Sequence, residues 1–192
     1  GAFQPDVATA EAWARSMIAT GEANGLCPTP ALLTRMDAPL GRAVGNWVEV
    51  KECIDIMADC RQQMTNGTAA TRDLVVLTVM QVAQMLANSG LYPSDSYEDL
   101  VRRTFTALCE GKALVMFREM VIAQGGDVAV VVDPASYPQA KVQRQLVATG
   151  SGFIKSIDAL TVGQVAVVQN ELTVFDMRVL IQVIDAVGVE QR

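Results

Sequence analysis

The chain has 192 residues, of which 51% are hydrophobic and 19% are charged. This composition excludes a disordered protein and is sufficient for one domain with a full core, or at most two small ones. The 15 basic and 21 acidic residues give a formal net charge of −6, which disfavours nucleic acid and anionic membrane surfaces as main partners. There is no histidine, which excludes histidine acid–base catalysis and histidine metal ligands within this chain. No apolar run reaches the ~18 residues that a membrane span requires.

The cysteines indicate the redox environment. Cys27, Cys53, Cys60 and Cys109 form no Cys-x-x-Cys pair. Cys53 and Cys60 lie seven residues apart, two turns of a helix, which is too far for a disulfide within one helix. We therefore expect four reduced thiols in an intracellular reducing compartment, the cytoplasm first and the mitochondrion as the alternative. Because the first residue is Gly1 rather than Met, we also expect a processed chain or one whose beginning is missing.

Three elements are predicted in the first third of the chain. Apolar residues at three- and four-residue spacing predict a helix over residues 9–23. A short apolar run bounded by prolines predicts a buried strand over residues 31–34. Asn46 and Glu49 have the spacing of a capping box, which predicts a helix over residues 46–62.

The middle of the chain is predicted to be helical. Residues 71–88 are apolar on nearly every side, as is typical of a central helix in a helical layer. A helix capped by Ser94 is expected to reach about Cys109, and another is expected over residues 112–124, before a pair of glycines. Residues 128–132 fit either a strand or a helical turn.

The composition changes at residues 133–138, and the sequence beyond them is β-like. Strands are predicted over residues 152–157 and 165–168, whereas the tail, residues 172–187, fits either a strand or a helix. The chain is therefore expected to divide near residue 132.

Together these elements predict an α/β fold, with helices packed on short parallel strands. Residues 1–132 are expected to form part of an α/β domain. Residues 133–192 are expected to form a partial or divergent α+β domain at the C-terminal end.

The loop over residues 39–46 is the most informative stretch for chemistry. A proline and two glycines lead into the predicted helix, so backbone carbonyls precede the helix and free amides open it. The amides could bind an anion, and the carbonyls could bind a hard cation if a carboxylate converges on them. Glu49 and Glu52 share one helix face, and Glu52 is the freer ligand because capping occupies Glu49. The alternative is that the glycines only permit tight turns and that Glu52 is solvated.

Other motifs predict no complete catalytic site. Lys112 follows Gly111, but no Gly-x-x-x-x-Gly-Lys-Ser/Thr pattern precedes it, which excludes a Walker loop. Residues 150–152 read Gly-Ser-Gly and lack the Gly-x-Ser-x-Gly nucleophile elbow.

Four separated motifs resemble one family. Residues 32–52 carry Thr-x-Met, then Pro-Leu-Gly-x-x-x-Gly-Asn and, shortly after, Glu-Val, in the order found in the thymidine phosphorylase and pyrimidine-nucleoside phosphorylase family. Gly-Ala-Phe at residues 1–3 resembles a segment that follows a sheet strand in that family. Gly-Lys-Ala at 111–113, followed by Ala-Gln-Gly-Gly-Asp at 123–127, resembles another, and residues 151–163 resemble the opening of its C-terminal domain.

The resemblance implies a fold, a reaction and site residues. The implied fold is a small α domain and a larger α/β domain that close over a cleft, in a homodimer. The implied reaction is phosphorolysis of a pyrimidine nucleoside to free base and pentose 1-phosphate, with phosphate as co-substrate and no organic cofactor. Phe3 would contact the pyrimidine, although Gln4 stands where the family has Met. The carbonyls of Leu40 and Ala43 and the carboxylate of Glu52 would bind a structural cation, monovalent or divalent.

The chain also departs from the family. The phosphate loop Lys-x-Ser-x-Gly-Gly is absent, as are the family's base-binding Arg, Ser and Lys and its histidine near the phosphate. No catalytic residue is therefore assigned here, and the chain alone is expected to be inactive. The resemblance implies a companion chain or segment that carries the phosphate loop, within a homodimer or larger assembly.

Two alternatives remain at this point. One is a degenerate homologue that acts as a non-catalytic structural subunit of a larger assembly. The other is a binding module stabilised by a cation at Leu40, Ala43 and Glu52.

Overall fold

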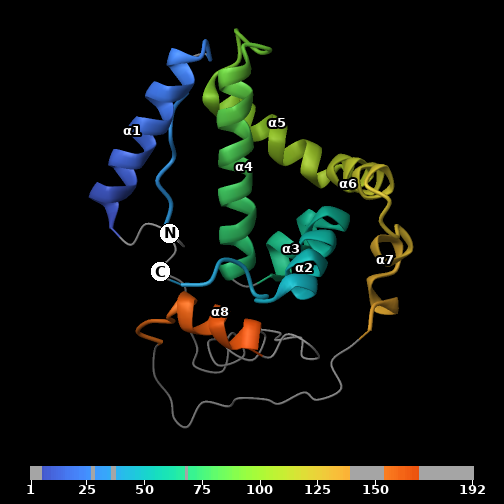
Figure 1. The fold of residues 1–192 in the computed structure, drawn as a ribbon. Coiled ribbons are helices and arrows are strands. Elements are labelled where there is room, and N and C mark those ends of the chain that lie inside the picture. The colour runs from blue at the N-terminus through green and yellow to red at the C-terminus, as the bar shows by residue number, and fades with distance from the viewer. Residues whose placement is uncertain (1–5, 27–28, 36–37, 68, 139–153, 169–192) are drawn as a thin grey trace.

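The computed structural model describes residues 6–26, 29–35, 38–67, 69–138 and 154–168, and its regular elements there are all helical (Figure 1). They are α1 (Val7–Ala23), α2 (Asn46–Ala58), α3 (Cys60–Asn66), α4 (Ala69–Ser89), α5 (Tyr97–Cys109), α6 (Lys112–Ala123), α7 (Ala129–Val132), the 3-10 helix η1 (Pro134–Ser136) and α8 (Ala159–Val168).

The strand predictions are the main correction. Residues 31–34 are extended but form no strand, and residues 165–168 lie inside α8. Of the strand predicted at 152–157, residues 154–157 are described and form no ladder, while 152 and 153 lie outside the described residues, as does the tail at 172–187. A strand needs a partner for its N–H and C=O groups, and the described part of the chain gives residues 31–34 none. The α/β class is therefore not confirmed, and the described fold is a set of packed helices.

Helix α1 ends at Ala23 as the sequence predicts, begins at Val7 rather than at residue 9, and stands apart from the helical body. Asp6 caps it, and the Oδ1 atom of Asp6 accepts the backbone N–H of Thr9 at 2.8 Å. No residue of α1 is buried, and the helix lies at the edge of the molecule in Figure 1. Trp13 is 60% and Met17 70% exposed, whereas Ala10, Ala14 and Ile18 are partly buried, so the apolar face that predicted this helix is only partly covered.

Two helices, α2 and α3, stand where one was predicted. Asp59 leaves the helical region, with φ −148° and ψ 69°, and its carboxylate accepts the N–H of Gln62 at 3.1 Å. The side chain of an aspartate competes for backbone N–H groups in this way and favours helix ends over helix interiors. Asp59 thus ends α2 and begins α3.

The helical body is organised around α4, the long green helix in Figure 1. This helix packs on α5 most extensively and also on α3, while α6 packs on α2 and α5. The central cluster combines buried residues of α2, α3 and α4 with partly buried side chains of α5. Its buried members are Ile56, Cys60, Val75 and Val79, and Val101, Phe105, Leu108 and Cys109 of α5 pack against them.

The prediction of a central helix holds for only one side of α4. Val75, Val79 and Ala83 are buried, whereas Val76, Met80 and Met85 are exposed. Among the described residues, the second apolar side of this helix is therefore uncovered.

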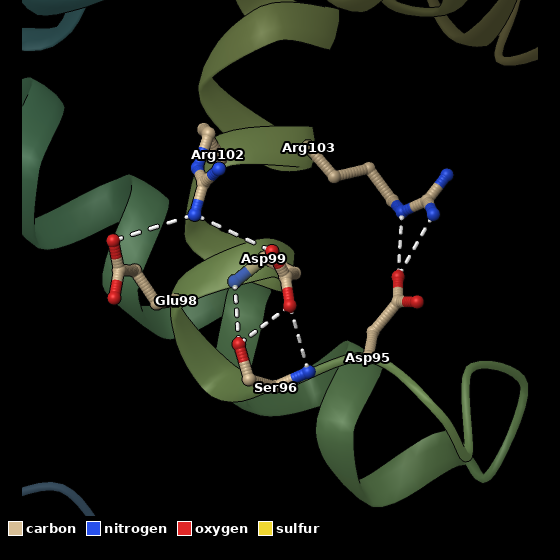
Figure 2. A network of polar contacts seen from close by, with 6 residues as sticks. All are labelled: Asp95, Ser96, Glu98, Asp99, Arg102 and Arg103. Carbon is tan, nitrogen blue, oxygen red and sulfur yellow. Dashed lines mark hydrogen bonds and ion pairs between the residues drawn. The ribbon is translucent and has the colours of Figure 1, made fainter.

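The start of α5 is fixed by a capping box, shown in Figure 2. Ser96 Oγ accepts the N–H of Asp99 at 3.2 Å, and Asp99 Oδ2 accepts the N–H of Ser96 at 3.1 Å. The predicted cap, Ser94, lies two residues too early. Arg103 pairs with Asp95 at 2.8 Å and lies over the ring of Tyr92, which holds the turn before α5 against the helix.

The segment after α6 returns to the body. Residues 129–132, predicted as a strand or a helical turn, form the short helix α7. The ring of Tyr137, just after η1, stacks on Trp47 of α2 with centroids 3.9 Å apart. The division of the chain near residue 132 stays a prediction. Within the described residues, no helix is long and apolar enough to cross a bilayer.

Candidate functional site

The loop before α2 closes around a buried carboxylate. Glu52 projects from α2 and is only 6% exposed. Its Oε2 atom accepts the N–H of Ala43 at 3.0 Å and the N–H of Arg42 at 2.9 Å, and Oε1 lies 3.0 Å from the same Arg42 nitrogen. The guanidinium Nε of Arg42 lies 3.5 Å from Oε1. A buried carboxylate is thus held by two backbone amides and one cation, which offset the cost of removing its charge from water.

Gly41 makes this close approach feasible. Its φ of +75° lies in the left-handed region, which an L side chain adopts only at a cost. A Cβ atom at this position would lie 2.8 Å from Glu52 Oε2 and 3.3 Å from the Leu74 side chain. Backbone conformation and space therefore both require glycine here.

The cap of α2 differs from the predicted one. The N-cap is Gly45, with φ +132°, which has no side chain of its own to accept the first helical amides, so Asn46 is the first helical residue. Glu49 does reach back as predicted, but its Oε1 atom accepts the N–H of Gly45 at 2.8 Å. The prediction of Glu49 as a capping residue is confirmed, and the prediction of Asn46 as the cap is wrong by one position.

The sequence predicted that the free amides at the start of the helix could bind an anion, and this stays a prediction. The amides that hold a carboxylate lie earlier, in the loop before α2, where those of Arg42 and Ala43 bind the chain's own Glu52. The prediction of a solvated Glu52 is wrong, because the carboxylate is buried. The missed partner is Arg42. Its position directly after Gly41 was a usable signal, since a tight glycine turn aims successive amides to one side.

The oxygen atoms at this loop are of the type that a hard cation binds. The carbonyls of Leu40 and Ala43 and the Glu52 carboxylate would supply three oxygens, fewer than the six to eight that calcium takes. The N–H groups on Glu52 already use most of its lone pairs, so a cation would share this carboxylate with Arg42. In the described part of the chain, no group of three or more His, Cys, Asp or Glu side chains could hold a metal ion.

The other residues that the sequence singled out are Phe3, Lys112 and the four cysteines. Phe3 lies outside the described residues. Lys112 pairs with Glu110 at 2.6 Å on the surface, as expected for a lysine outside a phosphate loop. Cys53, Cys60 and Cys109 are free thiols, whereas Cys27 lies outside the described residues. Partial loss of solvent around the sulfur, with the nearby charges of Glu52 and Glu49, raises the pKa of the Cys53 thiol, although the residue as a whole is exposed.

Comparison with known proteins gives the family. The chain is 34% identical over 166 residues to a thymidine phosphorylase of Mycobacterium tuberculosis, a match that covers 86% of this chain and 34% of the relative. It is 33% identical over 166 residues to a pyrimidine-nucleoside phosphorylase of Geobacillus stearothermophilus, covering 86% and 36%. A pyrimidine-nucleoside phosphorylase of Staphylococcus haemolyticus is 34% identical over 165 residues, covering 85% and 35%.

The chain is homologous to a segment of the thymidine and pyrimidine-nucleoside phosphorylase family. The resemblance carried by the four motifs is thereby confirmed. The chain spans about a third of the length of the curated relatives that it matches. No family model matches the chain.

Proposed function

We propose that this chain is part of a pyrimidine-nucleoside phosphorylase, which converts a thymidine- or uridine-like nucleoside and phosphate to free base and pentose 1-phosphate. The observation that carries the proposal is identity of about a third to such enzymes over 86% of the chain. In this reaction phosphate attacks the anomeric carbon while the base departs as an anion. Both charges need stabilising groups.

The chain's own contribution is a wall of the nucleoside cleft. Phe3 would contact the pyrimidine, as the resemblance implies, and no catalytic residue is assigned to this chain. The groups that bind phosphate and base would lie on a companion chain or segment that carries the phosphate loop. The proposed assembly is a homodimer or larger.

Exposed apolar side chains support a companion. Trp13 and Met17 of α1 are 60% and 70% exposed, and Leu33 of the extended segment 29–35 is 55% exposed. That segment forms no strand among the described residues. Exposed apolar side chains on a helix and on a loop segment are features that a partner surface would cover.

The test is a phosphorolysis assay on the purified chain and on the chain reconstituted with its companion. The substrates are thymidine, uridine and inorganic phosphate, and chromatography measures the free base. We expect phosphate-dependent release only with the companion. Release by the purified chain alone would contradict the proposed division of the site.

Phe3 can be tested in the reconstituted enzyme. If its ring contacts the base, Phe3→Ala should raise KM for the nucleoside about tenfold, because such a contact contributes ~1 kcal/mol or more. Phe3→Leu is the matched control and should keep most of the affinity. An unchanged KM in Phe3→Ala would remove this residue from the cleft.

The alternative function is a non-catalytic structural subunit. It predicts that the reconstituted assembly releases no base even though the chain binds a partner. Co-purification without phosphorolysis would therefore favour this alternative.

We also propose that Leu40, Ala43 and Glu52 hold a structural cation, with the remaining ligands supplied by water or by other segments. The test compares the thermal unfolding midpoint in potassium, sodium, magnesium and choline chlorides at equal ionic strength. We expect one of the metal ions to raise the midpoint of the natural protein. The shift should disappear in Glu52→Gln and persist in Glu49→Gln, which changes the neighbouring carboxylate on the same helix face. Equal midpoints in all four salts would contradict a bound structural cation. They would also contradict the alternative of a binding module that a cation stabilises.

A further inference from the structure

Two free cysteines meet inside the helical body. Cys60 is the first residue of α3 and Cys109 is the last residue of α5, and these two helices pack on each other. Cys60 belongs to the buried central cluster and Cys109 packs against that cluster. Interaction with Cys109 is also one of the causes that raise the pKa of Cys60. The proposed phosphorylase chemistry uses neither side chain.

The positions of the two residues suit a covalent link. A disulfide requires sulfur atoms in contact and Cβ atoms ~4 Å apart. Cys60 and Cys109 meet that need most readily among the described cysteines, because both belong to the packing where α3 meets α5. Both cysteines lie at helix ends, where a small backbone adjustment disturbs fewer intrahelical hydrogen bonds than it would within a helix.

The two thiols differ in access to solvent. Cys60 is 1% exposed, whereas Cys109 is partly exposed. Burial and the adjacent Cys109 raise the pKa of the Cys60 thiol to about 12, so Cys60 is protonated and slow to meet an external reagent at neutral pH. An oxidant would therefore reach Cys109 first.

We propose that Cys60 and Cys109 form a peroxide-sensitive dithiol, which oxidises to a reversible disulfide between α3 and α5. Hydrogen peroxide or an organic peroxide is the oxidant. The Cys109 sulfur attacks one peroxide oxygen, the O–O bond breaks, and Cys109 sulfenic acid and water (or an alcohol) form. The Cys60 sulfur then attacks the Cys109 sulfur, the S–O bond breaks, and a second water leaves with the Cys60 proton. Two thiols lose two electrons and the peroxide gains them, and a dithiol reductant reverses the reaction.

The disulfide would join α3 and α5 covalently. It closes a loop that contains all of α4 and joins the start of α3 to the end of α5. Closing a loop of this size removes conformations from the unfolded chain and stabilises the folded one.

The experiment is peptide mapping of the natural, full-length protein after brief treatment with hydrogen peroxide. Remaining thiols are alkylated under denaturing conditions, and peptides are identified with and without reductant. We expect a peptide pair linked through Cys60 and Cys109 that disappears on reduction. Cys53→Ala is the matched control, because it removes an exposed cysteine and should leave the linked pair unchanged.

A second measurement tests the order of events without relying on a variant. In the folded, reduced protein, iodoacetamide should alkylate Cys109 at least ten times faster than Cys60. The proposal is overturned if peroxide leaves both thiols alkylatable, or if it links either one to another cysteine instead. Alkylation of Cys60 at the same rate as Cys109 or faster would overturn the proposed entry through Cys109.

Discussion

The loop before α2 depends on a few atoms around the Glu52 carboxylate. Gly41 turns the chain so that the next two amides face Oε1 and Oε2, and the charge that they hold is buried. An unpaired carboxylate at this depth would be costly, so the amides and the carboxylate stabilise each other. The loop is therefore a fixed part of the structure rather than a flexible connection.

Gly41→Ala tests this arrangement. The left-handed backbone costs alanine ~1–2 kcal/mol, and displacing Glu52 from its amides adds ~1.5–3 kcal/mol. We expect the free energy of unfolding to fall by roughly 3 kcal/mol. Gly90→Ala is the matched control, since Gly90 has φ +68° but no atom within 4 Å of the added Cβ. It should show only the backbone cost, and equal losses in the two variants would contradict the close approach at Gly41.

At the residue scale, the sequence predicted types of interaction better than it predicted partners. It separated the capping Glu49 from Glu52, and it expected amides that attract an anion at the start of the helix. It did not predict that amides of the preceding loop hold Glu52, because helix periodicity says nothing about where a loop ten residues earlier will lie. It placed the cap at Asn46 because it weighed side-chain propensity above the conformational freedom of Gly45.

At the scale of single elements, the cap of α5 is open to a direct test. Ser96→Ala removes the side-chain acceptor for the N–H of Asp99, so we expect a loss of ~1 kcal/mol of unfolding free energy in chemical denaturation. Ser94→Ala is the matched control at the cap that the sequence predicted, and it should change stability by less than ~0.5 kcal/mol. A larger loss in Ser94→Ala than in Ser96→Ala would contradict the observed cap.

The same cap predicts a dependence on pH. Hydrogen bonds from Ser96 lower the pKa of Asp99, so Asp99 binds its proton less readily in the folded chain than in the unfolded one. The resulting stability is present above the unfolded pKa of about 4 and is lost as the pH falls through the folded pKa. The stability difference between the natural protein and Ser96→Ala should therefore shrink as the pH falls below about 4. Denaturant titrations across that range measure it, and a difference that grows with acidity would contradict the assignment.

The sequence predicted the helices better than the strands, for a physical reason. The predicted ranges of α1, α4, α5 and α6 differ from the observed ones only at their ends, because apolar spacing along one stretch of chain is recorded directly in the sequence. A strand at residues 31–34 also needs a neighbour elsewhere, and the described residues provide none. At residues 165–168, a run of valines and alanine suited a strand, but the helix α8 formed instead, since short apolar runs fit both periods.

At the scale of the whole molecule, Trp13 of α1 can serve as a fluorescence probe for binding of the proposed companion. Trp13 lies on the exposed face of this helix, and a companion that covers this face would move the indole out of water. In a Trp47→Phe variant, whose remaining tryptophan is Trp13, binding of the companion should shift fluorescence emission to shorter wavelength. The matched variant Trp13→Phe, which keeps the stacked Trp47, should shift less. Binding without a shift from Trp13 would place the companion elsewhere.

Asp59, the lone residue between α2 and α3, sets the angle between these two helices. Replacing it with leucine would remove the acceptor for Gln62 and favour one continuous rod. Each residue of such a rod has a direction fixed by the helical repeat, so the sulfur of Cys60 would rotate away from the end of α5. Asp59 has no thiol, but by ending α2 it orients Cys60 and so determines whether the proposed disulfide can form.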